Sequence, residues 1–123
     1  RLEVVADGSL FIIDFKTGNT AISKEDAKKN LQLASYQLGV HEGGFTDGDK
    51  SAGAELVYLG TSSAGALIRQ QYAIDLEETK QTIETIGEGM GAATFFATVN
   101  KRCKGCPVRK SCPVQSDGRA VIE

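Results

Sequence analysis

The chain has 123 residues, of which 41% are hydrophobic and 24% charged, and its formal net charge is -2. A chain of this length has room for one domain. Its ordinary apolar content, broken up by Gly, Ser and Thr, argues against a membrane span and against a largely disordered chain. The near-neutral balance also excludes a domain that attracts nucleic acid through its overall charge. Whether the chain binds nucleic acid therefore depends on where its charged residues lie.

The first 18 residues predict a β-hairpin. Strands are expected at residues 2–6 and 10–16, and the Asp7-Gly8 pair between them is a strong turn signal. The second strand is apolar on both faces near its start, which predicts a place in the centre of the sheet.

A helix is predicted over residues 24–40. Ser23 followed by Asp26 resembles a capping box at its start. Its apolar stripe, expected to dock on the sheet, consists of Ala27, Leu31, Ala34 and Leu38. His41 follows the helix and is interpreted as a polar residue at its C-terminal end.

The middle of the chain predicts a loop, two strands and a second helix. The loop is expected at residues 43–53, and the strands at 54–60 and 66–74, joined by a hairpin loop at 61–65. Asp75 can cap a helix over residues 76–96. Its expected apolar face consists of Leu76, Ile83, Ile86, Met90 and Phe95. The Gly87-Glu88-Gly89-Met90-Gly91 run is interpreted as a kinked helix packed close to a neighbour rather than as a phosphate loop.

The strand at residues 10–16 carries the first candidate chemistry. Alternation along a strand puts Asp14 and Lys16 on the same face, about 7 Å apart, and turns Phe15 the other way, into a core. A carboxylate beside an amine suits metal-assisted phosphodiester hydrolysis, in which Asp14 holds Mg²⁺ or Mn²⁺ and Lys16 orients or helps to deprotonate the attacking water. By itself, Asp-x-Lys is more often a surface ion pair.

The context of this pair resembles a known family. The segment Ile12-Ile13-Asp14-Phe15-Lys16-Thr17-Gly18, followed by Gln32-Leu33-Ala34-Ser35-Tyr36 on the next helix, is similar to the nuclease domain of the RecB-like branch of the PD-(D/E)xK superfamily. The resemblance implies a restriction-endonuclease-like α/β (α+β) core with a mixed sheet flanked by helices. It implies catalytic roles for Asp14, Lys16, Gln32 and Tyr36, with the Phe15 backbone carbonyl as a further metal ligand. Helical spacing places Gln32 and Tyr36 one turn apart, where they could contact the DNA backbone or the metal shell.

One departure from the family pattern concerns the start of the chain. The family carries another metal-binding acid on the preceding strand, which would stand just before Arg1, and an upstream helix that often adds a His. Glu3 is the local substitute, although an exposed or salt-bridged role is at least as common for such a residue. We therefore expect these 123 residues to be a C-terminal fragment that binds metal weakly and does not cleave DNA alone.

Three cysteines form a second candidate site. Cys103, Cys106 and Cys112 have the spacing C-x2-C-x5-C, which suits a soft metal with a fourth ligand from elsewhere. Zinc, an iron-sulfur cluster and unliganded thiols all remain open on spacing alone. Similarity to AddB/AdnB-type helicase-nuclease subunits implies a four-iron four-sulfur cluster whose fourth cysteine would precede Arg1. We expect the cluster to be absent or incomplete in this fragment.

Positive charge gathers around the cysteines. Five basic residues without an acidic neighbour are expected to track a DNA backbone, although a solvated tail is an equal alternative: Lys101, Arg102, Lys104, Arg109 and Lys110.

These features lead to one functional hypothesis. The resemblance implies a partial nuclease domain, with a core at residues 1–97 and a Cys-rich tail at 98–123, at the C-terminus of an ATP-dependent DNA helicase/exonuclease that acts in double-strand break repair. DNA, the helicase domains of the same parent chain and a second helicase-nuclease subunit are the expected partners, in a bacterial cytoplasm without membrane attachment. The alternatives are a non-catalytic nuclease-fold module that holds DNA or a partner, and a stand-alone CRISPR-associated exonuclease of the same superfamily.

Overall fold

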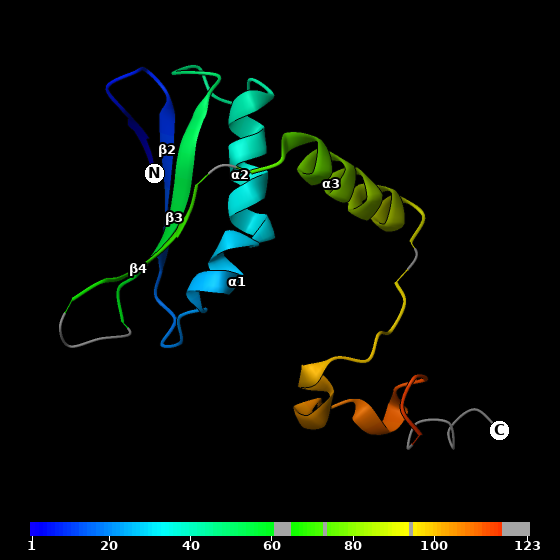
Figure 1. The fold of residues 1–123 in the computed structure, drawn as a ribbon. Coiled ribbons are helices and arrows are strands. Elements are labelled where there is room, and N and C mark those ends of the chain that lie inside the picture. The colour runs from blue at the N-terminus through cyan, green and yellow to red at the C-terminus, as the bar shows by residue number, and fades with distance from the viewer. Residues whose placement is uncertain (61–64, 73, 94, 117–123) are drawn as a thin grey trace. The chain divides into compact units, whose positions relative to one another are not determined.

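The computed structural model describes residues 1–60, 65–72, 74–93 and 95–116 (Figure 1). The chain divides into two compact units, Arg1–Thr85 and Ile86–Glu123. The first unit contains a four-stranded sheet with its helices. The Asp-x-Lys strand and the Gln-x-x-x-Tyr helix therefore belong to the first unit, and the cysteines belong to the second.

The predicted hairpin is confirmed. β1 (Leu2–Val4) pairs antiparallel with β2 (Leu10–Lys16). In the turn, Gly8 has a φ of +83°, which glycine adopts without strain. Asp7 accepts hydrogen bonds from the backbone N–H and from the hydroxyl of Ser9. These local contacts close the turn and lead the chain directly into β2.

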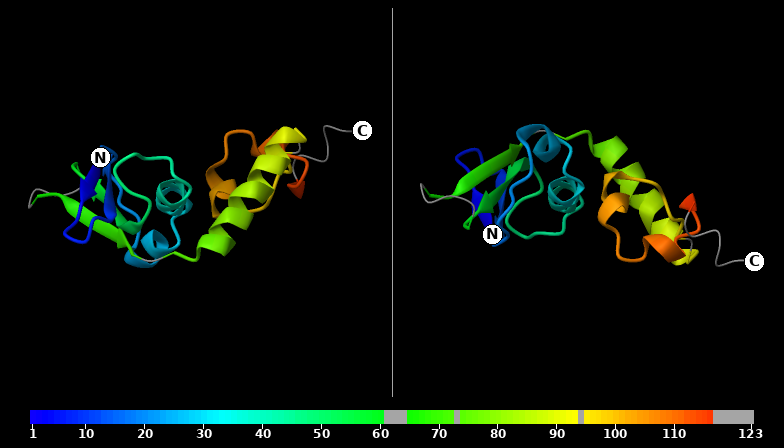
Figure 2. Two further views of the ribbon diagram at one scale, coloured as in Figure 1. Left: turned by 90° about the horizontal axis from the view of Figure 1, so that it is seen from above. Right: turned by 90° about the horizontal axis from the view of Figure 1, so that it is seen from below.

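The sheet is mixed, and its strands follow the order β1-β2-β3-β4. β2 runs parallel to β3 (Ser51–Tyr58), and β3 runs antiparallel to β4 (Leu67–Gln71). β2 therefore lies between two strands, as predicted. Because parallel neighbours need a crossover connection, the chain passes from β2 through α1 (Lys24–Lys28) and α2 (Leu31–His41) before it enters β3. Both helices lie on the same side of the sheet (Figure 2), so the expected α+β core is confirmed. The loop predicted at 61–65 falls largely outside the described residues.

The hydrophobic core lies between α2 and the helix-covered face of β2 and β3. Apolar side chains alternate along the two strands and meet those of α2, as the period of two predicts. The buried core residues are Leu10, Ile12, Leu33, Val40, Ala54, Leu56 and Tyr58.

The single helix predicted over residues 24–40 is instead two helices. Ser23 caps α1 as predicted, since its hydroxyl accepts the Asp26 N–H at 3.0 Å. Asn30 then interrupts the helix, because its side chain accepts the Leu33 N–H at 3.0 Å and forms the N-cap of α2. The interruption changes which residues face the sheet, and Leu31, predicted in the apolar stripe, is 38% exposed.

α3 (Leu76–Gly91) begins as predicted, with the Asp75 carboxylate accepting the Glu78 N–H at 2.9 Å. Its predicted apolar face is covered only in the first half of the helix, where Thr79 of the same face is buried and Ile83 is half-buried, whereas Ile86 and Met90 are exposed. The helix also ends at Gly91, before the predicted residue 96.

The glycine run of α3 does not mark a close contact. A Cβ added at Gly87, Gly89 or Gly91 would have no described atom within 4 Å, so the predicted close packing there is wrong. Beyond the helix, the second unit contains two short 3-10 helices, η1 (Lys101–Gly105) and η2 (Arg109–Ser111). No helix among the described residues is both long enough and apolar enough to cross a membrane.

Candidate active site

β2 brings Asp14 and Lys16 to the helix-covered face of the sheet, at the edge of the core. Asp14 lies opposite Leu56 of β3, and Lys16 lies opposite Tyr58. Both of those neighbours are buried, whereas the side chains of Asp14 and Lys16 remain 20% and 30% exposed. The same face of β2 thus changes from core at its first residues to a polar, half-buried site at its last ones.

Phe15 lies on the opposite face, and the expectation that it enters a core is wrong. Its side chain is 49% exposed. The two central strands bury their apolar residues mainly on the face that α2 covers, while Phe15 and Ile68 of β4 stay largely exposed on the other face. Alternation predicts which face Phe15 takes, but it cannot predict whether that face is covered.

α2 adds Gln32 and Tyr36 to the two residues of β2. Lys16 Nζ lies 2.8 Å from Asp14 Oδ2 and donates a hydrogen bond of 2.7 Å to Gln32 Oε1. Gln32 Nε2 in turn donates to the Tyr36 hydroxyl at 2.9 Å. The four residues predicted from two separate motifs are therefore joined in one continuous chain of polar contacts, which we call the Asp14–Tyr36 relay.

The chemistry of the donors fixes the direction of this relay. An ammonium group only donates, so the Gln32 carbonyl oxygen must face Lys16 and the amide nitrogen must face Tyr36. The Tyr36 oxygen accepts from that nitrogen, and its own O–H remains available to a further acceptor. Tyr36 is 38% exposed. The outer end of the relay thus presents a hydroxyl donor, and the inner end presents a carboxylate.

The carboxylate of Asp14 has an unusual oxygen. Oδ2 is buried and has no partner in hydrogen-bond geometry, although the Lys16 ammonium lies within ion-pair distance of it. Hard oxygen atoms of this kind are the ligands that Mg²⁺ prefers. No group of three His, Cys, Asp or Glu side chains among the described residues is placed to hold a metal ion. Asp14 is therefore the single carboxylate that the relay contributes.

Glu3 does not approach the relay. It lies opposite Phe11 in the β1–β2 ladder, whereas Leu2 and Ile12 form the neighbouring pair on the face of Asp14. Its carboxylate instead pairs with the Arg1 guanidinium at 2.9 Å, and both side chains are well exposed. The salt-bridged strand residue is thus the correct interpretation of Glu3.

A second polar network, buried beneath α1 and α2, was not expected from the sequence. Gln71 of β4 is 2% exposed, and its Nε2 lies 3.1–3.2 Å from the carbonyl oxygens of Ala27, Lys28 and Asn30. Gln37 of α2, 1% exposed, donates to Gln71 Oε1 at 3.0 Å. Gln71 thus ties the interruption between α1 and α2 to the sheet. The available signal was Gln37, which stands one turn after Leu33 on the buried face of α2.

The network continues to the start of β3. The Ser51 hydroxyl donates to Gln37 Oε1 at 3.1 Å, and the Ser51 N–H donates to His41 Nε2 at 3.4 Å. His41 is the last residue of α2. The interpretation of His41 as a polar residue at the helix end is therefore confirmed, with Ser51 as its partner.

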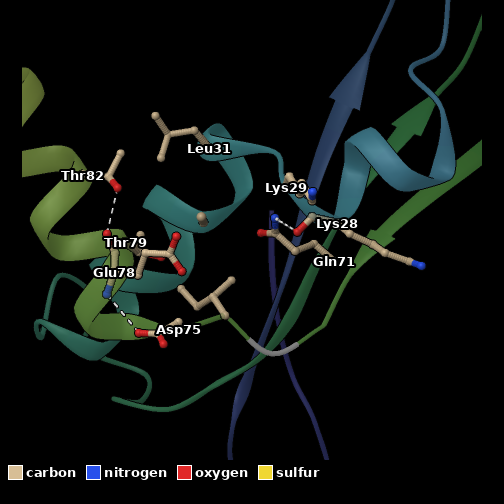
Figure 3. A pocket seen from close by; sticks show the side chains of 10 residues that line it. Lys28, Lys29, Leu31, Gln71, Asp75, Glu78, Thr79 and Thr82 are labelled. Atoms are coloured by element: carbon tan, nitrogen blue, oxygen red, sulfur yellow. Dashed lines mark hydrogen bonds between the residues drawn. The ribbon is translucent and has the colours of Figure 1, made fainter.

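An open hollow of about 520 Å³ lies beside the junction of α1, α2, β4 and α3 (Figure 3). No residue of the Asp14–Tyr36 relay lines it. Two lysines and two acids line the hollow on different sides, so it does not select one sign of charge, and we assign it no ligand. Its charged lining residues are Lys28, Lys29, Asp75 and Glu78.

The cysteines lie in the second unit, on η1 and next to η2. Cys103 accepts a hydrogen bond from the Asn100 N–H at 3.3 Å, and all three thiols are free and half-buried. The described residues contain no closely grouped set of three metal ligands, so Cys103, Cys106 and Cys112 are not gathered into one.

The five basic residues predicted to bind DNA also lie in the second unit, and we call them the basic cluster. Four of them are exposed, and Arg109 is half-buried. The cluster is Lys101, Arg102, Lys104, Arg109 and Lys110.

Comparison with known proteins agrees with this geometry. A family model described as the PD-(D/E)XK nuclease superfamily matches residues 1–113, a span that includes the relay, the mixed sheet and the three cysteines. A search of curated proteins finds no match. An Asp-x-Lys pair at the end of a central strand, in contact with a Gln and a Tyr of the following helix, is the arrangement that the resemblance to such nucleases implied. With nine-tenths of its length matched, the chain belongs to the PD-(D/E)XK nuclease superfamily.

Proposed function

We propose that the Asp14–Tyr36 relay is the catalytic centre of a metal-dependent DNA nuclease. The observation that carries this proposal is the hydrogen bond between Lys16 and Gln32, because it joins a strand motif and a helix motif that the sequence offers only separately. Surface ion pairs of the Asp-x-Lys kind do not need a third and a fourth polar partner. Membership of the superfamily supports nuclease chemistry as the use of this arrangement.

Nucleases of this superfamily generally use a divalent metal such as Mg²⁺. The residues present fit such an ion in part: the Asp14 carboxylate, whose Oδ2 faces the Lys16 ammonium, is one proposed ligand, and the Phe15 backbone carbonyl is the other. When bound, the ion supplies Lewis-acid polarisation of the phosphodiester and of a water molecule. A single carboxylate is a weak ligand set for this purpose, so we propose that the 123-residue chain binds Mg²⁺ or Mn²⁺ weakly.

The protein's own groups then have distinct tasks. Lys16 Nζ has three N–H groups, of which one is directed to Gln32 and one faces Asp14, and the third is available for a water molecule or a phosphate oxygen. Gln32 holds the ammonium in place and orients the Tyr36 hydroxyl. The free O–H of Tyr36 donates to a phosphate oxygen of the DNA backbone. The relay thereby positions the scissile group and offsets charge that develops on it.

The finer identity rests on the resemblance. We propose an AddB/AdnB-type nuclease domain that acts as an exonuclease within an ATP-dependent helicase/exonuclease of double-strand break repair in bacteria, beside the helicase domains of the same chain and a partner subunit. The support is the combination of the relay motif with the cysteine spacing of Cys103, Cys106 and Cys112. The complete gene product would settle the parent, since a long helicase region distinguishes it from a stand-alone CRISPR-associated nuclease.

The nuclease proposal is tested in the complete gene product with end-labelled linear DNA and Mg²⁺. Asp14→Asn and Lys16→Met should each lower the cleavage rate by at least about 100-fold, because each removes a charge aimed at the reacting group. Glu55→Gln is the matched control, because Glu55 lies opposite Ile13 on the other face of the sheet and should leave the rate unchanged. Unchanged cleavage in Asp14→Asn, or DNA binding without any cleavage in the unaltered protein, would contradict the proposal and favour a non-catalytic module.

The 123-residue chain by itself should show no robust cleavage at the same Mg²⁺ concentration, since its relay holds one carboxylate. Efficient Mg²⁺-dependent cleavage by this chain, lost in Asp14→Ala, would show that its ligand set is sufficient.

The cysteine site has a separate test. The three thiols are not gathered in the described residues, so the structure does not by itself fit a metal cluster, and we propose a four-iron four-sulfur cluster for the complete protein alone. Anaerobically purified complete protein should contain iron and absorb visible light through thiolate-to-iron charge transfer. Zinc in place of iron, or no metal at all, would overturn this part without affecting the nuclease proposal.

A further inference from the structure

We propose that Phe95 and Phe96 form a stacking site for unpaired DNA bases, next to the basic cluster that holds the phosphates of the same strand. The choice of DNA as the nucleic acid rests on the proposed function. The site itself rests on the exposure of the two rings and on the charge around them.

The two rings are the most exposed phenylalanines of the chain. Phe95 is 78% exposed and Phe96 is 85% exposed, compared with 49% for Phe15 and 38% for Phe45. They follow α3, which ends at Gly91. The backbone of Ala93, with a φ of +51°, is left-handed and does not continue the helix. Two adjacent aromatic rings therefore stand outside the core of their own unit.

The described chain beyond the rings carries charge of one sign, and the nearest acid before them is Glu88 of α3. Residues 89–116 contain the five Lys and Arg of the basic cluster and no Asp or Glu. An apolar protein surface would cover two phenyl rings equally well, but it gives no reason for a following segment whose charges are all positive. A nucleic-acid strand needs both features, because its bases stack on aromatic side chains and its phosphates pair with Lys and Arg.

Local hydrogen bonds order the segment that leads into the basic cluster. The Asn100 carbonyl oxygen Oδ1 accepts the Arg102 N–H at 2.9 Å, and Asn100 Nδ2 donates to the Thr98 carbonyl at 3.2 Å. Lys101 follows Phe96 by five residues, so the two can be at most about 18 Å apart along an extended chain. A few nucleotides of one strand can therefore reach both.

Stacking on these rings also predicts a preference for single strands. In a duplex each base is already stacked and paired, so its face is available to a phenyl ring only after unpairing. Phosphates are equally accessible in both forms. The phenylalanines should thus select unpaired DNA, while the basic cluster binds both forms through charge.

Binding of the 123-residue chain to fluorescent oligothymidylate and to a duplex tests this directly. The assay contains EDTA, so cleavage and metal binding do not contribute. Phe95→Ala and Phe96→Ala should each weaken oligothymidylate binding at least about fivefold and leave duplex binding and the salt dependence unchanged. Lys101→Ala and Arg102→Ala should weaken both ligands and reduce the slope of log affinity against log salt by about 0.7 for each lost phosphate contact on the single strand.

Two further variants separate stacking from general apolar contact. The variants Phe95→Leu and Phe96→Leu keep apolar area without a planar ring and should bind oligothymidylate as poorly as the Ala variants. Phe95→Trp and Phe96→Trp should retain binding. Because the chain contains no Trp, Phe96→Trp also supplies a single fluorophore, whose emission should be quenched when oligothymidylate binds. Phe45→Trp in the first unit is the matched control and should not be quenched.

The outcomes also separate this inference from the nuclease proposal. Unchanged oligothymidylate affinity in both Phe→Ala variants, or full binding by the Leu variants, would overturn the stacking site and indicate that a protein surface covers the rings. Neither result depends on Asp14 or on cleavage. Conversely, loss of the nuclease proposal would leave a Phe-dependent preference for single strands intact.

Discussion

Replacing Gln71 with Met should destabilise the first unit by about 3 kcal/mol. The Gln71 amide has two N–H groups, which serve the carbonyls at the α1–α2 interruption, and one oxygen, which accepts from Gln37. With two N–H groups and one accepting oxygen, the amide makes three hydrogen bonds at a time. Each of them has a net worth of about 1 kcal/mol. Met keeps a side chain of similar length, so little packing is lost. For a domain of 60–100 residues, the loss corresponds to a fall in Tm of roughly 12–24 °C.

The measurement is thermal and urea unfolding followed by far-ultraviolet circular dichroism. Gln70→Met is the matched control, because Gln70 is the neighbouring residue of β4 and is exposed, and its two side-chain hydrogen bonds, to Glu55 at 3.1 Å and from the Tyr72 hydroxyl at 2.7 Å, lie on the surface. Its effect should stay within about 0.5 kcal/mol, as for most surface changes. Equal destabilisation by the two substitutions would refute the reasoning, because it would show that burial and the shared carbonyl contacts do not matter.

Two further predictions concern the local caps and turns. Asn30→Ala should lower the free energy of unfolding by about 1 kcal/mol through loss of the α2 N-cap. Asn30→Ser should retain most of that stability, because a Ser hydroxyl can also cap a helix. Urea unfolding measures both variants, and equal losses would contradict the role of the cap. Asp7 should titrate below its usual pKa of 3.8, because hydrogen bonds from the Ser9 side chain and backbone favour its carboxylate. The stability that these bonds contribute is present above the unfolded-state pKa and is lost as the pH falls through the lower folded-state pKa. NMR titration should show this pKa rising in Ser9→Ala, and an Asp7 pKa at or above 3.8 in the unaltered chain would disprove it.

Features with local causes were predictable from the sequence. The Asp7-Gly8 turn, the Ser23 cap and the Asp75 cap each depend on a side chain that bonds to backbone within three residues. The central position of β2 also agrees with its own composition, since apolar residues on both faces are typical of an interior strand. Sequence reasoning succeeds where the partner of a residue lies next to it in the chain.

Features that depend on distant partners were not predictable. The apolar spacing of residues 24–40 fits one helix as well as two. Asn30 becomes an N-cap only where the carbonyls of Ala27 and Lys28 find another donor, which Gln71 provides from β4. Phe15 was assigned to the correct face, but its exposure depends on what covers that face. The sequence likewise identified the members of the relay by two spacings, whereas the contact between Lys16 and Gln32 joins residues 16 positions apart and exists only in the fold.

The interruption at Asn30 is also what assembles the relay. α1 packs on β4, while α2 packs on β3 and β2. A straight helix through residues 24–40 would have to follow a single direction over the sheet, and the contact of its first turns with the edge strand β4 would fix that direction. The break lets α2 take its own path over the central strands, and its first turn then places Gln32 against Lys16 at the end of β2. Asn30 sets where that turn begins, and Gln71 holds the break to the sheet. Both residues therefore determine the geometry of a site in which neither makes a direct contact.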